Sequence, residues 1–193
     1  QDYDDILRTF SDIEKKEIAD PPLFFEWNIW RSFAMLNDGD ISGNFKIDDD
    51  GIPLYTAAGN MADIVCKYKD FETLVEVTMS SGHKQYEMEG EPVARHYGDF
   101  KKTTDKDVYC IFIAPQVSGA TIAHYYILYR TNVEKYGGKA KIIPISLSDF
   151  KQLLSNAYKA EKKPSSTEIK KLWEDLSDLA LKSNSETEWY EAI

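Results

Sequence analysis

Basic residues are scarce in this sequence of 193 residues, cysteine occurs only twice, and long apolar runs are lacking. Lysine and arginine together number 23 against 33 acidic residues, so the formal net charge is −10 at pH 7. A protein that grips DNA by itself needs a basic surface that displaces counterions from the phosphates. The charge therefore predicts either that the chain binds no nucleic acid or that a partner supplies most of the grip.

The small number of cysteines bears on redox chemistry, and the lack of long apolar runs bears on membranes. Cys66 and Cys110 lie in apolar strand-like runs, where a thiol behaves as a small buried hydrophobic side chain, and no zinc motif accompanies them. No run approaches the ~20 apolar residues of a membrane span. The acidic start from Gln1 to Asp5 is also unlike a signal peptide. We expect structural thiols in a cytoplasmic protein that has no membrane partner.

Two isolated acids, Asp63 and Glu76, stand in apolar runs whose period-2 alternation is typical of half-buried strands. The runs cover residues 63–68 and 72–79, and the polar segment 69–71 joins them. This pattern predicts a β-hairpin.

The pairing of this hairpin sets the distance between the two acids. A turn centred near Asp70 places Asp63 opposite Val77 or Thr78, so Glu76 is a direct or diagonal neighbour of Asp63 within roughly 5–8 Å. Side chains alternate between the two faces of a strand. One face would carry Glu76 and Thr78, and the other Val75, Val77 and Met79.

Two close carboxylates stay ionised only at a cost unless a positive charge lies between them, and Mg²⁺ with oxygen ligands commonly fills that place. One interpretation is therefore a magnesium site at Asp63 and Glu76. The alternative, which the pattern alone favours, puts Asp63 at the exposed start of its strand and Glu76 on a hydrated sheet face.

A third acid stands in an apolar helix. The segment Leu23 to Leu36 is apolar on most sides, with Asp20 as a predicted N-cap and Pro21 at the first helical position. Glu26 lies in its middle, and an unpaired buried carboxylate is costly. Either Glu26 pairs with Arg31 or lies on a hydrated stripe, or it turns toward the metal site.

The remaining patterns predict an alternating series of elements. Further helices are expected over 4–19, 83–100, 118–136, 146–160 and from 166 or 167 onward. Further strands are expected over 44–47, 107–115 and 141–145, with turns at 37–40 and 48–51. Pro92 should interrupt the helix that contains it, because proline breaks a helix interior. The order predicts an α/β domain over 1–193 with a mixed central β-sheet flanked by α-helices.

The acids and the strand that carries Glu76 resemble the PD-(D/E)xK nuclease core. More specifically, several strings resemble the cleavage domain of the AlwI, MlyI and PleI group of type IIS restriction endonucleases. These strings are Glu76-Val77-Thr78, Gln85, Glu89-Gly90-Glu91-Pro92-Val93 and Arg95-His96. The similarity covers roughly residues 23–145 and implies a restriction-endonuclease-like core in a prokaryotic, cytoplasmic setting.

The chain has about the size of that domain alone. It is therefore most similar to the small, cleavage-only subunit of a heterodimeric type IIS restriction endonuclease whose large subunit is a sequence-recognising nickase. The resemblance implies a single cleavage domain without a DNA-recognition domain. It also implies Mg²⁺-dependent hydrolysis of one strand of double-stranded DNA, giving a 5′-phosphate and a 3′-hydroxyl, only when the large subunit is present.

The resemblance assigns roles to individual residues. Asp63 takes the place of the motif aspartate and Glu76 the second acidic position, and both would hold Mg²⁺ together with the Val77 carbonyl. Thr78 stands where the general motif has lysine, which leaves the activator of the attacking water open. His83, Lys84 or Gln85 could reach back from the following segment, and the alternative for Lys84 is a solvent-exposed helix lysine. Glu26 could hold a second metal's water or orient the nucleophile.

Two cations follow the acids. Arg95 and His96 could contact the scissile phosphate or hold a carboxylate, although a single histidine is often structural. Two rival functions stay open at this point. The missing motif lysine favours a catalytically degenerate interaction subunit of a DNA-processing complex, and the acidic charge admits a DNA-mimic inhibitor, which would not explain a buried Glu26.

Overall fold

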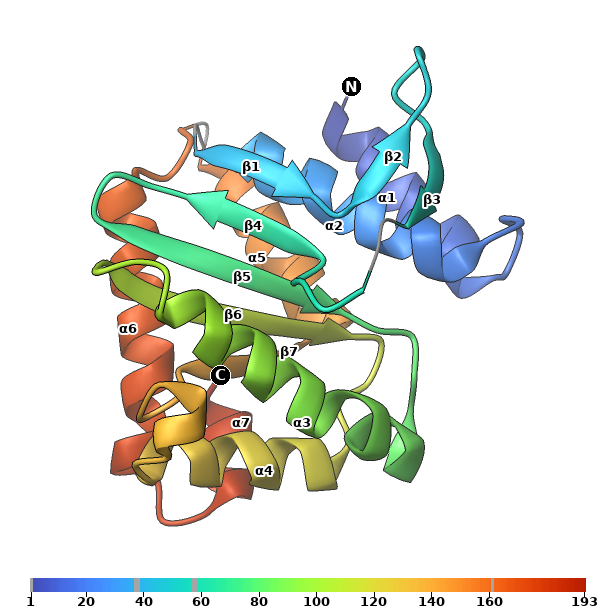
Figure 1. The fold of residues 1–193 in the computed structure, drawn as a ribbon. Coiled ribbons are helices and arrows are strands. Elements are labelled where there is room, and N and C mark those ends of the chain that lie inside the picture. Colours follow the sequence, from blue (N-terminus) through green and yellow to red (C-terminus); the bar gives the residue numbers. More distant parts are fainter. Residues whose placement is uncertain (1, 37–38, 57–58, 161) are drawn as a thin grey trace.

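The computed structural model describes residues 2–36, 39–56, 59–160 and 162–193, and its centre is a mixed five-stranded sheet (Figure 1). In spatial order the strands are β1 (Asp40–Gly43), β4 (Ile64–Lys67), β5 (Phe71–Val77), β6 (Asp107–Ala114) and β7 (Ile142–Ser146). β4 pairs antiparallel with β1 and with β5, whereas β5, β6 and β7 run parallel. A separate hairpin consists of β2 (Phe45–Ile47) and β3 (Pro53–Thr56).

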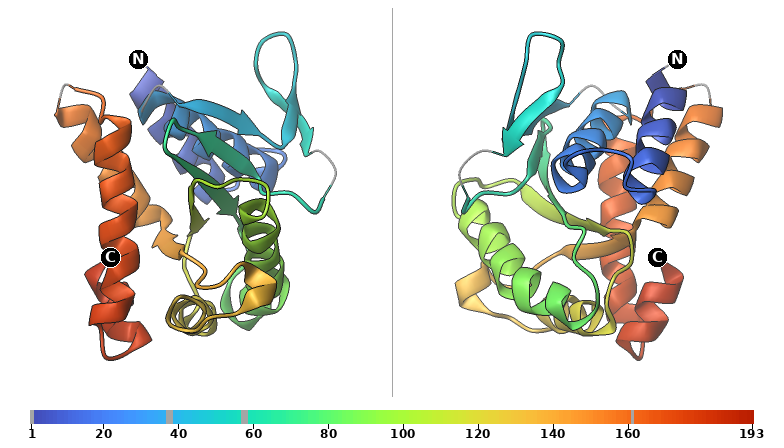
Figure 2. Two further views of the ribbon diagram at one scale, coloured as in Figure 1. Left: turned by 60° about the vertical axis from the view of Figure 1, so that its left-hand side comes forward. Right: turned by 90° about the vertical axis from the view of Figure 1, so that its right-hand side faces the viewer.

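Helices cover both faces of this sheet (Figure 2). They are α1 (Asp2–Glu14), α2 (Pro21–Leu36), α3 (Gly82–Lys101), α4 (Gly119–Arg130), the short 3₁₀ turn η1 (Glu134–Tyr136), α5 (Leu147–Lys159), α6 (Ser166–Lys182) and α7 (Glu186–Ala192). One apolar core lies between the sheet and α1, α2 and α5, and the other lies under α3, α4 and α7. The mixed sheet flanked by helices was predicted from the sequence.

The β4–β5 hairpin forms as predicted, but its register differs by one or two residues. Ile64 pairs with Val75, and continuing the ladder by one step sets Asp63 opposite Glu76 rather than Val77 or Thr78. The reason is a tighter turn, because the Tyr68 N–H donates to the Phe71 carbonyl at 3.0 Å. The two rings stack with centroids 4.3 Å apart, so Phe71 belongs to the strand and not to the turn.

The two faces of β5 are assigned correctly. Val75 is buried in the core under α2, and Val77 and Met79 pack against that core. Glu76 lies on the opposite face, where its carboxyl contacts His96 of α3. The sheet therefore separates an apolar face from a face that carries an acid.

The predicted interruption of α3 at Pro92 is wrong, because the helix runs through the proline. Proline removes one backbone donor and frees carbonyls in the preceding turn. Here the helix α4 contacts carbonyls in that turn: the Tyr125 hydroxyl donates to the Glu89 carbonyl at 3.4 Å, and the His124 ring bonds the backbone of Gly90. α4 thus packs against the turn of α3 that precedes the proline.

Other boundaries differ for local reasons. The first helix ends at Glu14 instead of residue 19, because Lys16 takes a left-handed φ of 59°. The helix predicted over 118–136 ends at Arg130, where Thr131 becomes extended and η1 follows. The last long helix is capped by Ser165, through a capping box with Glu168, and not by residue 166 or 167.

Three elements, β1, β3 and α7, were not predicted. Of the predicted turn 37–40, Asn37 and Asp38 lie outside the described residues. Both cysteines are buried and unpaired with each other, as expected for structural thiols. In the part of the chain that the structure describes, the helices are too short or too polar to cross a bilayer.

Candidate active site

A cleft of about 610 Å³ opens at the C-terminal end of β5, between the first halves of α2 and α3. Four acidic side chains from four segments line it: Glu26 from α2, Asp63 just before β4, Glu76 from β5 and Glu89 from α3. In Figure 1, α2 and α3 lie on either side of the sheet near this end of β5. The fold therefore gathers the three acids predicted from the sequence and adds a fourth.

Asp63 is held in place by the strand opposite. Its Oδ2 accepts a hydrogen bond of 2.7 Å from the Val77 N–H, and the residue is half-buried. Asp63 is therefore not simply at the solvent-exposed start of its strand, which was the alternative. The bond fixes one carboxylate oxygen against β5, and Asp63 lines the cleft.

Glu76 is only 5% exposed, so the alternative of a hydrated sheet face is also wrong. Its Oε1 lies 2.9 Å from Nδ1 of His96, which comes from the middle of α3. The imidazole thus orients the carboxyl group. This contact matches the role of holding a carboxylate that the sequence left open for His96.

Glu89 was part of the resemblance but had no role assigned to it. It accepts a hydrogen bond from the hydroxyl of Thr78, the residue that stands in place of the motif lysine. Glu89 and His96 are seven residues apart, which is two helical turns, so they share one face of α3. That spacing is a sequence signal, but it is visible only if α3 is continuous through Pro92.

Burial acts on all four carboxyl groups, and repulsion by neighbouring acids acts on Glu26, Asp63 and Glu76. Burial and then the charge of Asp63 raise the pKa of Glu26 to about 8. Burial and then Glu76 raise the pKa of Asp63 well above its usual value, and burial followed by Glu89 does the same for Glu76. Burial also raises the pKa of Glu89, while burial and the charge of Arg95 lower that of His96. The cleft is an acidic site that a bound cation would stabilise.

Glu26 turns toward this cleft and not toward Arg31. The Arg31 guanidinium instead pairs with Asp5 at 2.5 Å and lies over the Trp27 ring. Thr56 bonds the Glu26 carboxyl, whose Oε2 is buried without a partner among the described residues. An orphaned carboxylate oxygen that lines an acidic cleft is a free ligand for a cation.

Comparison with known proteins gives these acids a context. The sequence model of the AlwI restriction endonuclease family matches residues 5–153. This chain belongs to the AlwI restriction endonuclease family. The assignment confirms the predicted family and the enzyme class, an endonuclease.

A solved structure extends the comparison beyond the family match. The crystal structure of the small subunit (R.BspD6I2) of the heterodimeric restriction endonuclease R.BspD6I is similar to this chain, with 26% sequence identity and a TM-score of 0.80. The alignment covers 98% of this chain and 98% of that subunit, which confirms the restriction-endonuclease-like fold. No curated protein sequence gave a significant match.

Of the residues predicted to activate the attacking water in this AlwI-family chain, Lys84 lies at the cleft and His83 does not. Lys84 is exposed and lines the cleft. His83 points away, with its side chain 74% exposed and Nε2 3.3 Å from Glu87. The structure therefore brings Lys84 to the acids and does not bring His83 there.

Gln85 is completely buried and bonds only to backbone groups in the contacts described. Its Nε2 donates to the carbonyls of Ser80 and Gln116 at 2.7 and 2.9 Å, and its Oε1 accepts from the Ser118 N–H at 2.8 Å. The amide joins the loop after β5 to the loop after β6. Gln85 thus positions the chain beside the site instead of contacting a reacting atom.

Arg95 bonds Glu91 through Nε at 3.3 Å, one turn back along α3. It affects the site electrostatically, since its charge lowers the pKa of both Glu76 and His96. His96 itself lines the cleft. Of the two predicted phosphate contacts, His96 lines the cleft and Arg95 is not among the residues that line it.

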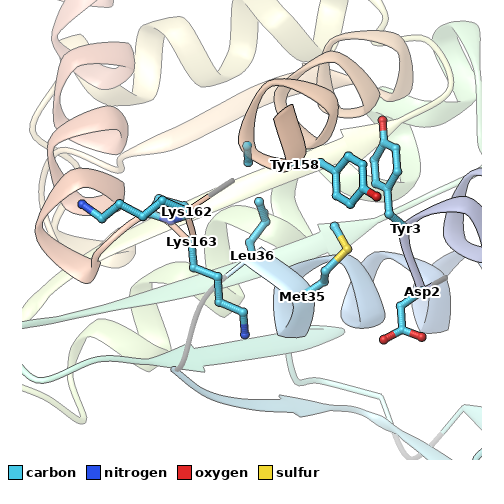
Figure 3. A pocket seen from close by; sticks show the side chains of 9 residues that line it. Asp2, Tyr3, Met35, Leu36, Tyr158, Lys162 and Lys163 are labelled. Atoms are coloured by element: carbon cyan, nitrogen blue, oxygen red, sulfur yellow. The ribbon is translucent and has the colours of Figure 1, made fainter. Parts of the chain in front are cut away.

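A different pocket of about 350 Å³ lies at the other end of α2 (Figure 3). Tyr3 and Tyr158 stack there with ring centroids 4.2 Å apart, beside Met35 and Lys162. This lining is largely aromatic and aliphatic and lacks the convergent carboxylates of the cleft. Convergent carboxyl groups therefore distinguish the acidic cleft from this pocket.

Proposed function

We propose that this chain hydrolyses one strand of double-stranded DNA, using Mg²⁺ held by Asp63, Glu76 and the Val77 carbonyl. The convergence of four carboxyl groups, with Glu76 buried and the other three half-buried, in an AlwI-family fold carries the proposal. Oxygen ligands suit Mg²⁺, and the ion needs only one or two protein carboxylates because it keeps several waters. Within the described residues no group of three or more Asp, Glu, His or Cys side chains is arranged to hold a metal ion, so Mg²⁺ would have to take its remaining ligands from water and phosphate.

The residues of the chain fit the steps of phosphodiester hydrolysis. Bound Mg²⁺ would lower the pKa of a coordinated water and neutralise charge on the phosphorane. Glu26, with its orphaned oxygen, would orient the attacking water. Glu89 would accept the proton of that water, because a carboxylate with a raised pKa is a stronger base and Thr78 holds it where the motif lysine is missing.

Lys84 would provide the positive charge that the phosphate meets at the rim of the cleft. Among the residues described as lining this cleft, Lys84 is the one lysine. His96 would keep Glu76 oriented through the contact at 2.9 Å. The products of the reaction would be a 5′-phosphate and a 3′-hydroxyl.

Cutting would depend on a large, sequence-recognising nickase subunit that delivers the DNA. The net charge of −10 gives the isolated chain little attraction for phosphates. The similar R.BspD6I2 is a small subunit of a heterodimeric enzyme, which supports the same arrangement here. Each subunit would then cut one strand.

A plasmid nicking assay tests this function. Wild type with the large subunit should linearise a plasmid that carries the recognition site, whereas Asp63→Asn with the large subunit should leave it nicked. Asp105→Asn, an exposed acid at the other end of the sheet, is the matched control and should cut like wild type. Site-specific cleavage by the isolated chain would refute the dependence on a partner.

The rival function is a degenerate interaction subunit, which the threonine at position 78 favours. Calorimetric titration with MgCl₂ separates the two. The proposed enzyme should bind Mg²⁺ in a manner that Asp63→Asn abolishes. A degenerate core would give the same heat signal for wild type and for the variant.

A further inference from the structure

The β2–β3 hairpin, residues 45–56, protrudes from the end of the molecule that carries the acidic cleft (Figure 2). We call it the arm. Its base reaches the cleft, because Thr56 is part of the cleft lining. The arm exposes four apolar side chains: Ile47, Ile52, Leu54 and Tyr55. Leu54 and Tyr55 are 55% and 58% exposed, and because they are adjacent in β3 they point to opposite faces of the arm.

The arm is a fixed structure and not a loose loop. The Trp27 indole N–H donates to the Gly51 carbonyl at 3.0 Å, and the rings of Trp30 and Phe45 pack edge to face with centroids 5.7 Å apart. In the turn, Oδ1 of Asp48 accepts the N–H groups of residues 50 and 52 at 3.0 and 2.8 Å. An apolar surface that is held in one shape binds a partner at low entropic cost.

Apolar exposure continues from the arm onto the rim of the cleft. Met61 and Met88, which both line the cleft, are 62% and 50% exposed. Methionine side chains adapt to the shape of a contacting surface. Exposed apolar side chains therefore lie both on the arm and at the cleft that its base lines.

The charge of the arm selects the kind of partner. Its turn carries three consecutive aspartates, Asp48 to Asp50, and its strands carry one lysine, Lys46. These acids would repel DNA phosphates, and they would also repel the same turn of a second copy of this chain. The combination fits a protein surface that is apolar in the centre and basic at its edge.

We propose that the arm is the docking surface for the sequence-recognising large subunit, which would contact it with an apolar patch bordered by lysine or arginine. This inference rests on the proposed function, because it names the surface that the proposed partner uses. The place of the arm fits the task. Two catalytic clefts must meet on one DNA site to cut both strands, and a partner docked beside this cleft holds its own cleft close to it.

Binding measurements with purified large subunit on a DNA duplex carrying its recognition site test the inference. Leu54→Ser with Tyr55→Ser should raise the Kd of the heterodimer at least about tenfold, since central apolar residues dominate interfaces. The matched control is Ile127→Ser with Leu181→Ser, two apolar residues exposed to a similar degree on α4 and α6, which should bind like wild type. All variants should keep the melting temperature of wild type, because the substituted side chains are exposed.

Charge reversal provides an independent test. Added salt should raise the Kd of the wild-type complex, because it screens the attraction between the acidic turn and the basic border of the partner. Asp49→Lys with Asp50→Lys should raise the Kd at low salt, and added salt should then lower it, because salt screens the repulsion. Asp48 is left intact because it holds the turn. Asp105→Lys with Glu191→Lys, which changes the same number of charges elsewhere, is the control.

The outcomes separate a failure of the docking inference from a failure of the proposed function. If the arm variants bind the large subunit like wild type, the docking surface lies elsewhere and the inference is wrong. If charge reversal strengthens binding to DNA alone and leaves the heterodimer intact, the arm faces DNA. If the wild-type chain forms a homodimer and the arm variants are monomers, the arm binds a second copy of the chain. Either outcome would overturn the inference. If wild type itself forms no complex with the large subunit, the proposed function fails and the inference falls with it.

Discussion

The side chain of Asp63 and the backbone of Val77 are joined by a hydrogen bond of 2.7 Å, so the acid just before β4 also fixes the end of β5. The same two residues are proposed ligands of Mg²⁺. One contact therefore sets the geometry of the hairpin and of the metal site together. Substitutions at position 63 can separate these two contributions.

Asp63→Ala and Asp63→Asn should differ in stability but not in activity. Both remove the negative ligand, so both should lower the rate of strand cutting at least ~100-fold if the metal supplies several kcal/mol of transition-state stabilisation. Asn retains an oxygen that can accept the Val77 N–H, whereas Ala loses a hydrogen bond worth about 1 kcal/mol. Urea unfolding in EDTA measures the difference.

In this experiment Asn should be the more stable of the two variants. Equal stabilities would show that the bond to Val77 contributes nothing to the hairpin. Near wild-type cutting by either variant would instead show that Asp63 is not a ligand.

Glu76→Gln should stabilise the metal-free protein while abolishing cutting. Glu76 is buried among like charges, and burial followed by Glu89 raises its pKa well above the usual value. The neutral amide keeps the size of the side chain and the contact with His96 but removes the repulsion. Thermal unfolding at pH 7 in EDTA should give a higher Tm for Glu76→Gln than for wild type.

A lower Tm for that variant would mean that the carboxylate is already compensated by charges of the protein. Glu91→Gln is the control on the same side of the sheet. That acid is exposed and paired with Lys135 and Arg95, which lower its pKa, so removing its charge should not raise the Tm.

The sequence was sufficient to predict the pair Asp63 and Glu76, because period-2 alternation and a polar turn are local signals. The register was wrong since it depends on the stacking of Tyr68 on Phe71, which no local pattern reveals. Glu89 was missed for a different reason. A helix broken at Pro92 would not carry Glu89 and His96 on one face, but α3 runs through the proline and packs against α4, which lies far along the chain.

The fold shows the same division between local and distant causes. The capped α5 helix and the apolar β6 strand follow from nearby residues, and both lie close to their predicted bounds. β1 was missed because the edge strand Asp40–Gly43 has only one large apolar residue, Ile41, and pairs by backbone contacts with β4. Gln85 could not be recognised as a positioning residue, since its partners lie in loops that only the sheet brings together.

The stability of the metal-free protein should fall as the pH rises from about 4.5 to about 8, the usual and the raised pKa of Glu26. A raised folded-state pKa means that the native protein binds more protons than the unfolded chain in this window, so unfolding becomes easier as protons leave. Below the window the stabilising protonated form is fully present. Urea unfolding across this pH range, compared between wild type and Glu26→Gln, isolates the contribution.

The slope of that difference should be negative in EDTA and should flatten when MgCl₂ is added, because a bound cation replaces the lost protons. Parallel curves for wild type and Glu26→Gln would mean that Glu26 ionises normally. A slope that magnesium leaves unchanged would mean that the cation binds away from Glu26.

Gln85→Ala and His83→Ala should separate a structural residue from an exposed one on the same turn of α3. Gln85→Ala leaves the Ser80 and Gln116 carbonyls and the Ser118 N–H without their partner, and each buried unsatisfied group costs about 1–3 kcal/mol. His83 loses only an exposed contact with Glu87, so His83→Ala should unfold like wild type. Chemical denaturation gives the free energy of unfolding of both variants.

Gln85→Ala should also lose cutting only in proportion to the unfolded fraction or through a raised KM, since the amide positions loops beside the acids. A large loss of kcat in fully folded Gln85→Ala, with KM unchanged, would contradict this assignment and return Gln85 to the candidates for activating water.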